Sequence, residues 1–404
     1  MLTYDFVVIG AGVVGINIAL RLKQQYTDAS IVVLDKEERC GLHASGRNSG
    51  VLHAGFYYTS NSLKARLCRQ GNRLLTAYCE EKRIPLNKCG KLVVARNESE
   101  CKVLDLLLQR GKDNGVNLEL ISDKEAREIE PRVLTHERAI YSPSTSSVDP
   151  KAVMAAFVDD VKRNGIEVHN SVRYIKRLHD GILTSVGKYQ AGYVVNAAGL
   201  YADKIAMDYG FSKHYRMLPF KGVYLYSNEP AGSIRTNIYP VPDLRNPFLG
   251  VHFTVTSNGN AKIGPTAIPA LWLEQYQGMS RFNLGEMAEI VARQVPLVFF
   301  SKFDFKKLAL EEVKKYSRRY MVSQAAQLLS GVSATHYKKW GPPGIRAQLL
   351  DLRTKALEMD FVIEGDRHSL HVLNAVSPAF TCSIPFSEYV VEKLDRWLHE
   401  GVQV

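Results

Sequence analysis

No stretch of this chain is long and apolar enough to span a membrane, and no short motif pairs its cysteines. A membrane-spanning helix needs about 18 or more apolar residues in a row, and the sequence of 404 residues holds no such run. The uncharged run at residues 6–20 follows Asp5 and has no basic segment before it, so we expect no targeting segment. These absences favour a globular protein that stays in the compartment where it is made, and we expect a cytoplasmic location.

The six cysteines are scattered singly and show none of the spacings of a metal site. This pattern fits packed thiols in a reducing compartment, and we expect no metal ion. The chain also lacks internal repeats and low-complexity tracts. Its length exceeds what one hydrophobic core usually serves, which predicts two domains.

The charge balance is basic, with a formal net charge of +11. A basic surface can attract nucleic acid or anionic lipid, or it can steer an anionic substrate. A nucleic-acid surface clusters its cations with aromatic residues between them, whereas the cations here are mostly spread along the chain. We therefore expect no nucleic-acid partner, and a basic lipid- or nucleic-acid-binding module on a dinucleotide fold is the non-enzyme alternative.

One segment admits two interpretations. Residues 295–300 (VPLVFF) are apolar, and the region 302–319 that follows them is rich in pairs of basic residues. An apolar tip followed by a basic helix is typical of a peripheral membrane protein, which would lie at the inner face of the cytoplasmic membrane. The alternative, which we favour, is a core-facing segment followed by a solvated helix face.

The strongest motif lies at residues 4–15 (YDFVVIGAGVVG). Residues 6–9 form a short apolar run suited to a parallel strand that is covered on both faces. Gly10 permits a tight turn, Gly12 lets the backbone approach a pyrophosphate, and Gly15 allows close packing of the helix that follows. The N-terminus of that helix offers free N–H groups and a positive dipole to phosphates.

A second apolar strand at residues 31–34 ends at Asp35, about 20 residues after Gly15, where a carboxylate can hold a ribose hydroxyl pair. Strand, glycine turn, helix and acid together predict a dinucleotide-binding unit. These features do not decide between a nicotinamide and a flavin cofactor.

Helical periodicity predicts a helix at residues 62–82 with Ser62 as N-cap, and another at 122–130 that ends before Pro131. Further helices are expected from Pro150 and over 387–399. Strands are expected at residues 90–95, 165–168, 193–196, 222–226, 248–254 and 260–263. Segments of two compositional types alternate along the chain. This favours a discontinuous cofactor domain with a mostly antiparallel domain inserted into it.

Four loop segments carry unusual chemistry: residues 43–58 (HASGRNSGVLHAGFYY), 194–203 (VVNAAGLYAD), 239–254 and 341–379. Together with the glycine motif they resemble the D-amino-acid oxidase-like flavoproteins, and within them the L-2-hydroxyglutarate dehydrogenase/oxidase family. The resemblance covers essentially the whole chain. Its most specific pieces are residues 48–58, 62–68 (SLKARLC), 89–94 (CGKLVV), 247–254 (PFLGVHFT) and 344–348 (GIRAQ).

The resemblance implies FAD as cofactor and an α/β fold with a Rossmann-like FAD-binding domain and an inserted, mostly antiparallel β substrate domain. We expect residues 1–89, 150–215 and 340–404 in the first domain, and 90–149 and 216–339 in the second. Cys40 lies near the cofactor loop, so a covalent flavin link stays an open alternative. The residues expected to contact FAD are Gly10, Gly12, Gly15, Asp35, Ser45, Asn48, Ser49, Val168, Ala198, Gly199, Asn374, Ser377 and Pro378.

The implied activity is oxidation of a 2-hydroxy acid, which needs a base for the hydroxyl proton and cations for the carboxylates. Histidine suits the base because its pKa lies near working pH, and His53 and His252 both match family histidines. Arg346 resembles the arginine that holds a substrate carboxylate in related oxidases. Weaker candidates for the substrate are Lys221, Arg47, Tyr57 and Tyr58.

Two positions depart from the family pattern, since Lys221 stands where arginine is usual and Thr266 where asparagine is usual. Both lie on the substrate side, so they leave the substrate open between L-2-hydroxyglutarate and an amino acid or glycerol 3-phosphate. The electron acceptor also stays open among oxygen, a quinone and an electron-transfer protein.

Overall fold

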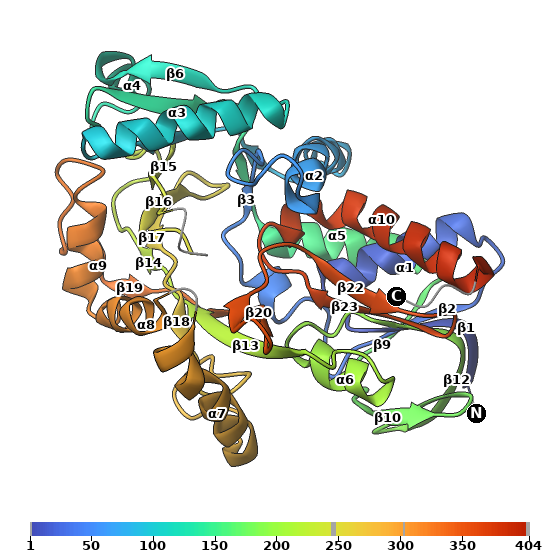
Figure 1. Cartoon of the computed structure of the whole chain (residues 1–404). Helices are drawn as coiled ribbons and strands as arrows, with labels where there is room; N and C mark the ends of the chain where they lie inside the picture. The colour runs from blue at the N-terminus through green and yellow to red at the C-terminus, as the bar shows by residue number, and fades with distance from the viewer. Residues whose placement is uncertain (1, 244–247, 302–303, 401–404) are drawn as a thin grey trace. The chain divides into compact units, whose positions relative to one another are not determined.

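The structure is a computed structural model that describes residues 2–243, 248–301 and 304–400 (Figure 1). The chain forms two compact units, each built from separated segments. Unit 1 contains residues 1–48, 150–219 and 346–404, and unit 2 contains residues 49–149 and 220–345. The chain passes from one unit to the other after residues 48 and 149, and again within strand β13 (Tyr215–Gly222) and within strand β20 (Gly344–Asp351).

Unit 1 is organised around a sheet whose central strands are parallel. Strand β1 pairs in parallel with β12 on one side and with β2 on the other, and β2 pairs in parallel with β9. The strands of this sheet are β1 (Leu2–Ile9), β2 (Ile31–Leu34), β9 (Glu167–His169), β10 (Tyr174–Leu178), β11 (Gly181–Thr184), β12 (Gly187–Asn196), β22 (Val362–Gly365) and β23 (Ser369–Asn374). Strand β21 (Ala356–Leu357) pairs with β20.

Helices cover both faces of this sheet (Figure 1). Helix α1 (Val13–Gln25) packs between α5 (Pro150–Arg163) and α10 (Ala379–Glu400), and α6 (Ala202–Asp208) packs on β10, β12 and β23. Two short 3-10 turns, η1 (Ala44–Gly46) and η2 (Gly199–Tyr201), follow strand ends. Because both faces of the sheet are covered, residues 6–9 of β1 are all buried, as their continuous apolar run predicts.

Unit 2 contains a mostly antiparallel sheet with the strand order β19-β14-β17-β16-β15-β5-β7-β6. Its strands are β5 (Lys91–Val94), β6 (Glu119–Ser122), β7 (Arg138–Ser142), β14 (Leu225–Tyr226), β15 (Asn237–Pro240), β16 (His252–Val255), β17 (Ala261–Gly264) and β19 (Lys339–Trp340). A smaller sheet joins β3 (Val51–Leu52), β8 (Ser146–Val148) and β4 (Leu86–Asn87), and β18 (Ile268–Pro269) pairs with β13.

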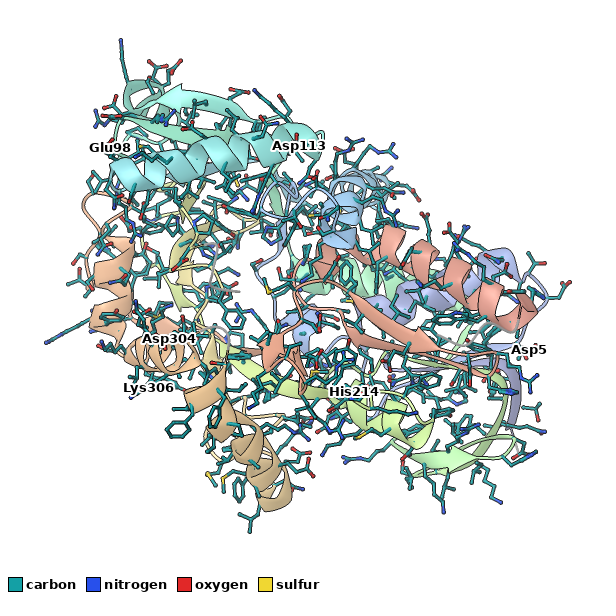
Figure 2. All side chains as sticks on the ribbon, in the orientation of Figure 1. Asp5, Glu98, Asp113, His214, Asp304 and Lys306 are labelled. Carbon is teal, nitrogen blue, oxygen red and sulfur yellow. The ribbon has the colours of Figure 1, made fainter. Side chains whose placement is uncertain are left out.

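The helices of unit 2 are α2 (Leu63–Glu81), α3 (Glu98–Asp113), α4 (Asp123–Ile129), α7 (Leu284–Phe300), α8 (Phe305–Lys314) and α9 (Arg318–Ala325). Glu98 and Asp113, labelled in Figure 2, mark the two ends of α3. One face of the large sheet forms an apolar core with α4 and α9, and includes Leu92, Ile238, Phe253 and Ile263.

The main predictions of secondary structure are confirmed. Ser62 accepts a hydrogen bond from the Ala65 N–H and caps α2, and Ser122 with Glu125 forms a capping box at the start of α4. Helix α10 begins at Ala379, eight residues before the predicted start (387 − 379), and contains Pro385. Proline is a probable helix boundary and not an obligatory one, which explains the difference.

The strand expected over residues 248–254 is described only as β16, from His252 to Val255. Pro247 and its neighbours 244–246 lie outside the described residues. Residues 49–89, assigned from the sequence to the cofactor domain, lie in unit 2 because β3 and β4 pair with β8 and α2 packs on both strands.

The glycine turn between β1 and α1 is closed by direct contact of backbone atoms. A Cβ atom placed on Gly15 would lie 2.0 Å from the carbonyl oxygen of Gly10, and one placed on Gly10 would lie 2.5 Å from the carbonyl oxygen of Ala197. Gly10 also has φ of 109°, in the region that favours glycine. No L side chain fits at either position without moving backbone.

We therefore predict that Gly15→Ala lowers the free energy of unfolding by about 3 kcal/mol or more, because a methyl group must displace backbone. Urea unfolding of the purified protein measures the loss. Gly165→Ala is the matched control, since Gly165 has φ of 69° and nothing lies within 4 Å of the position that its methyl group would take, so it should lose only about 1–2 kcal/mol. Equal losses in the two variants would contradict the close contact.

Candidate functional site

The N-terminus of α1 has the features of a phosphate site. Gly12 caps the helix without a side-chain hydrogen bond, and the described first turn holds no acidic residue. The Val13 N–H donates to Ser45 Oγ at 2.9 Å, so the serine hydroxyl also lies at the helix end. Free N–H groups and a positive helix dipole, undisturbed by a carboxylate in that turn, suit the pyrophosphate of a dinucleotide.

Asp35, directly after β2, holds the glycine turn in place. Its carboxylate accepts hydrogen bonds from the Ala11 N–H at 2.8 Å and from the Glu37 N–H at 2.9 Å. A carboxylate has about four acceptor positions, so two such bonds leave capacity for the ribose hydroxyls that the sequence assigns to it. Asp35 therefore stabilises the turn and keeps acceptor positions beside it.

Three other predicted cofactor residues, Ala198, Gly199 and Asn48, lie near this turn or in the loop of Ser45. Ala198 Cα lies 3.1 Å from the position a Cβ atom on Gly10 would take, and Gly199 begins η2 with φ of 56°. Asn48 donates from Nδ2 to the Ser45 carbonyl at 2.7 Å and so orders its loop. Val168 lies on β9, at the edge of the sheet, and pairs with Val33 of β2.

The remaining predicted cofactor residues lie elsewhere. Asn374, at the end of β23, is fully buried, and its amide bonds the backbone at Leu349, Glu358 and Asp360. Ser377 is exposed and Pro378 buried just before α10. Ser49 belongs to unit 2, where its carbonyl accepts a hydrogen bond from Lys262 Nζ at 3.1 Å. The turn, Asp35, Ser45 and Ala198 nevertheless form one cradle that fits an FAD pyrophosphate and ribose.

In unit 2, the side of the large sheet opposite its apolar core carries a group of polar side chains. Residues alternate between the two faces of a strand, so the neighbours of Leu92, Ile238, Phe253 and Ile263 point away from the core. We call this side the polar face and define it by Lys91, Tyr239, His252, Thr254 and Lys262. The register agrees, because Thr254 of β16 lies opposite Lys262 of β17.

His252 is held in a defined orientation on the polar face. Its ring stacks on Tyr239 with 3.8 Å between ring centroids, and its Nδ1 lies 2.8 Å from the Gly250 carbonyl oxygen. A carbonyl only accepts, so Nδ1 carries the hydrogen, and Nε2 of the neutral ring keeps its lone pair. His252 can therefore accept a proton at Nε2.

His53 follows β3 and belongs to the same electrostatic environment. The pKa of His53 is lowered to about 3, mainly by desolvation and to a smaller extent by the charges of Lys91 and His252. The His53 carbonyl accepts a hydrogen bond from the Cys68 thiol at 3.3 Å, which ties its backbone to α2. The imidazole is thus neutral at pH 7, which is the form that a general base requires.

Two buried lysines on the polar face were missed from the sequence. Lys91 is 0% exposed, and its Nζ lies 4.5, 4.7 and 4.9 Å from the ring centroids of Phe56, Tyr57 and Tyr239. Desolvation lowers the pKa of Lys91 to about 7 and that of Lys262 to about 8. The available signal was a lysine within each short apolar strand, at residues 91–94 and 261–264.

The other substrate candidates are distributed over both units. Lys221 is half-buried on β13 opposite Ile268, and desolvation lowers its pKa. Tyr58 is half-buried and its carbonyl accepts a hydrogen bond from Asn114. Arg346 on β20 and Arg47, which donates from Nε to the Leu42 carbonyl at 2.7 Å, belong to unit 1.

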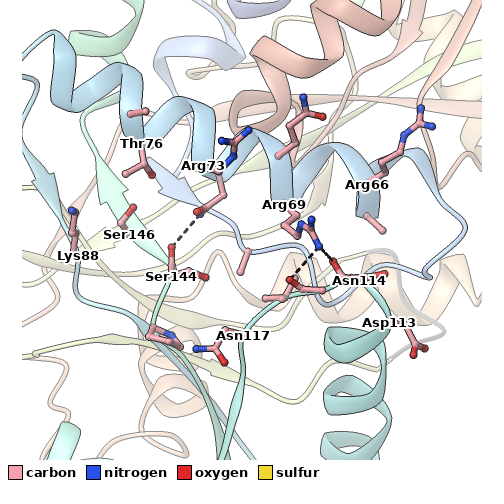
Figure 3. Close-up of a pocket in the computed structure, with 18 of the residues that line it drawn as sticks. Arg66, Arg69, Arg73, Thr76, Lys88, Asp113, Asn114, Asn117, Ser144 and Ser146 are labelled. Atoms are coloured by element: carbon pink, nitrogen blue, oxygen red, sulfur yellow. Dashed lines mark hydrogen bonds between the residues drawn. The ribbon is translucent and has the colours of Figure 1, made fainter.

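A pocket of about 1110 Å³ lies in unit 2 along α2, bordered by the turn after α3 and by residues 143–146 (Figure 3). Its basic lining includes Arg69, which donates from Nη1 to the carbonyls of Asn114 and Gly115 at 3.3 and 3.4 Å. This guanidinium already serves to bind the C-terminal end of α3. We therefore place the candidate substrate site on the polar face and not in this pocket.

Comparisons with known proteins identify the family of the chain. The family described as FAD dependent oxidoreductase matches residues 5–393. The chain is 36% identical to the mitochondrial L-2-hydroxyglutarate dehydrogenase of Nematostella vectensis, covering 96% of this chain and 90% of the relative. It is 35% identical to the L-2-hydroxyglutarate dehydrogenase of Indibacter alkaliphilus (96% and 98% covered) and 32% identical to that of Escherichia coli strain K12 (98% and 94% covered).

Solved structures show the same fold at lower identity. The L-alpha-glycerophosphate oxidase of Mycoplasma pneumoniae with FAD bound superposes with a TM-score of 0.77 at 20% identity, over 98% of this chain and 95% of that one. The glycine oxidase of Geobacillus kaustophilus gives a TM-score of 0.74 at 19% identity, over 100% and 96%.

The full-length match and the shared fold define the class of the protein, which is an FAD-dependent oxidoreductase acting on a CH–OH group. Within that class, the chain belongs to the L-2-hydroxyglutarate dehydrogenase family. The fold class and the cofactor expected from the sequence are confirmed.

Proposed function

We propose that the protein oxidises L-2-hydroxyglutarate to 2-oxoglutarate. The observation that carries this proposal is the polar face, where two histidines able to accept a proton adjoin two buried lysines. A base and a concentration of positive charge are what a hydroxy dicarboxylate requires. Relatives that are 32–36% identical over nearly the full chain carry the name of this activity.

In this mechanism a histidine takes the proton from the substrate hydroxyl as the C2–H bond breaks. Bound FAD supplies the acceptor for the hydride, held by the cradle of unit 1. His53 and His252 are the candidates for the base, since each ring can be neutral and present a lone pair. The residue that receives the proton carries a positive charge until the oxidised product leaves.

The substrate carboxylates need fixed cations. Within unit 2 we propose that Lys221 holds a carboxylate, with Tyr58 as a hydroxyl donor. Arg346, a residue of unit 1, stays the candidate that the family motif predicts for a carboxylate, because a guanidinium binds a carboxylate through two parallel hydrogen bonds. Hydrogen bonds to charged groups contribute about 1.5–3 kcal/mol each. An amino acid or glycerol 3-phosphate would place a different group against Lys221, and these are the alternative substrates.

The substrate assignment predicts which compound reduces the flavin. Under anaerobic conditions, L-2-hydroxyglutarate should bleach the visible absorbance of the purified holoenzyme, while D-2-hydroxyglutarate, glycerol 3-phosphate and amino acids should leave it oxidised. Stopped-flow absorbance measures the rate for each. A flavin that stays oxidised with L-2-hydroxyglutarate and bleaches with another compound would refute the assignment.

The assignment of the base predicts a loss of flavin reduction by L-2-hydroxyglutarate in one histidine variant. Replacing the base, by His53→Ala or His252→Ala, should slow reduction by about 10²–10⁴-fold. Because desolvation lowers the pKa of His53 to about 3, kcat/KM should show no acid limb from His53 between pH 5 and 7. The matched control His136→Ala removes an exposed histidine of unit 2. Unchanged rates in both variants would exclude both residues.

We further propose that the protein is a peripheral membrane protein that contacts an anionic phospholipid surface through α7 and α8. Phe299 and Phe300 are 73% and 65% exposed, so the core-facing interpretation is wrong for these two residues, whereas Leu297 of the same segment is buried. Helix α8 follows with exposed Lys306, labelled in Figure 2, and Lys307. Of the helices in the described part of the chain, none combines the length and apolar character needed to cross a membrane. A quinone in the bilayer is the electron acceptor that this contact favours.

This contact predicts binding to vesicles of phosphatidylcholine mixed with phosphatidylglycerol. The double variant Phe299→Ser, Phe300→Ser should bind at least about 10-fold more weakly, because each exposed phenylalanine gains about 1.5–3 kcal/mol when buried. Leu120→Ser is the control, since Leu120 is an exposed apolar residue on β6 of the same unit. Sedimentation with vesicles measures binding, and equal binding by the two variants would contradict the proposal.

A further inference from the structure

Lys91 is a buried cation without a balancing partner. It begins β5, between Asn237 of β15 and Ser142 of β7 in the sheet register. Among the described residues its Nζ has no hydrogen-bond partner, and the titratable group that acts on its pKa is the Cys68 thiol and not a carboxylate. An unpaired charge in a protein interior is costly, so a lysine with only a packing role would be less favourable here than an apolar residue of similar length.

The aromatic groups around Lys91 cannot supply the missing negative charge. Its ammonium faces the rings of Phe56, Tyr57 and Tyr239, and cation–π contact only partly replaces hydration. Burial raises the pKa of the Tyr57 and Tyr239 hydroxyls, so both phenols are neutral. The remaining titratable neighbours are the Cys68 thiol on α2 and the imidazole of His53, with His252 acting on His53 from β16.

We propose that Lys91 is a positioning and specificity-determining residue whose charge is balanced by the carboxylates of the bound substrate. This inference rests on the proposed function, because it assumes that the anion binds at the polar face. Lys91 acts from within its enclosure of rings, through its electric field on the polar face, and need not touch the substrate. The low polarity of its surroundings strengthens that field, which favours a dianion over a monoanion.

Binding of the anion is then coupled to protonation. Without ligand, desolvation holds the pKa of Lys91 near 7. A nearby anion stabilises the ammonium and raises that pKa, so binding between pH 7 and 9 takes up a proton from solvent onto Lys91 Nζ. Below about pH 6 the amine is already charged and no uptake is expected. As pH rises through the raised pKa, the anion affinity falls.

The experiment uses glutarate, a dicarboxylate that lacks the oxidisable hydroxyl, and the holoenzyme with Lys91→Met, which keeps the length of the side chain without its charge. Titration calorimetry at pH 8, in two buffers of different ionisation enthalpy, gives the affinity and the number of protons taken up. The control is Lys88→Met, which removes an exposed lysine of unit 2 that pairs with Glu80 at 2.7 Å.

We expect wild type and Lys88→Met to bind glutarate with proton uptake, and Lys91→Met to bind about 10- to 100-fold more weakly without uptake. The Lys91→Met substitution should weaken the binding of butyrate, a monocarboxylate, less than it weakens the binding of glutarate. Lys91→Met should also raise KM for the substrate more than it lowers kcat. Its thermal midpoint at pH 7 should be higher than that of wild type. In wild type, Lys91 binds a proton more tightly in the unfolded chain than in the folded protein, which favours unfolding, and Lys91→Met removes this difference.

Two results would overturn the inference: glutarate binding and proton uptake that survive in Lys91→Met, or wild-type binding without uptake. The outcome is separable from that of the proposed function. If L-2-hydroxyglutarate reduces the flavin while Lys91→Met binds glutarate normally, only the role of Lys91 fails. If L-2-hydroxyglutarate does not reduce the flavin but glutarate binding depends on Lys91, the substrate assignment fails and the role of Lys91 stands.

Discussion

The alternation of side chains along β-strands is the constraint on which the candidate substrate site depends. In the large sheet of unit 2, one set of alternating residues forms the apolar core with α4 and α9. The other set must then face the opposite way. Because β5, β15, β16 and β17 are neighbours in this sheet, their residues Lys91, Tyr239, His252 and Lys262 gather on one surface. A shift of one residue in register would bury the polar set in the core instead.

In unit 1, the candidate cofactor site depends on the close approach of backbone segments. Its glycine turn brings Gly10 against Ala197 and Gly15 against Gly10, at distances that no side chain permits. Asp35 then fixes the turn through the Ala11 N–H. The N-cap residue of α1 is Gly12, and the Ser45 hydroxyl accepts from the Val13 N–H. The positive helix dipole at this end makes the cradle suitable for a negatively charged pyrophosphate. The cradle therefore depends on glycine positions that admit no side chain, together with Asp35 and Ser45. The candidate substrate site depends on the side chains of the polar face.

The polar face also shows a conflict between stability and function. Lys91 and Lys262 are buried where desolvation lowers their pKa, and histidines stand beside them. Such an arrangement weakens the fold when no anion is present. It is suited to a site whose ligand brings two negative charges, because the cost of burial is then offset by attraction to the ligand.

The sequence by itself determined the glycine turn, the strand that ends at Asp35, the capped helices α2 and α4, and the membership of the family, because each follows from local patterns or continuous motifs. It also pointed to His53 and His252 through such motifs. Only the tertiary structure decided that Lys91 is enclosed by Phe56, Tyr57 and Tyr239, and that Phe299 and Phe300 are exposed. Burial of a lysine depends on rings contributed by residues far along the chain. An apolar segment has the same sequence pattern whether it faces the core or the solvent.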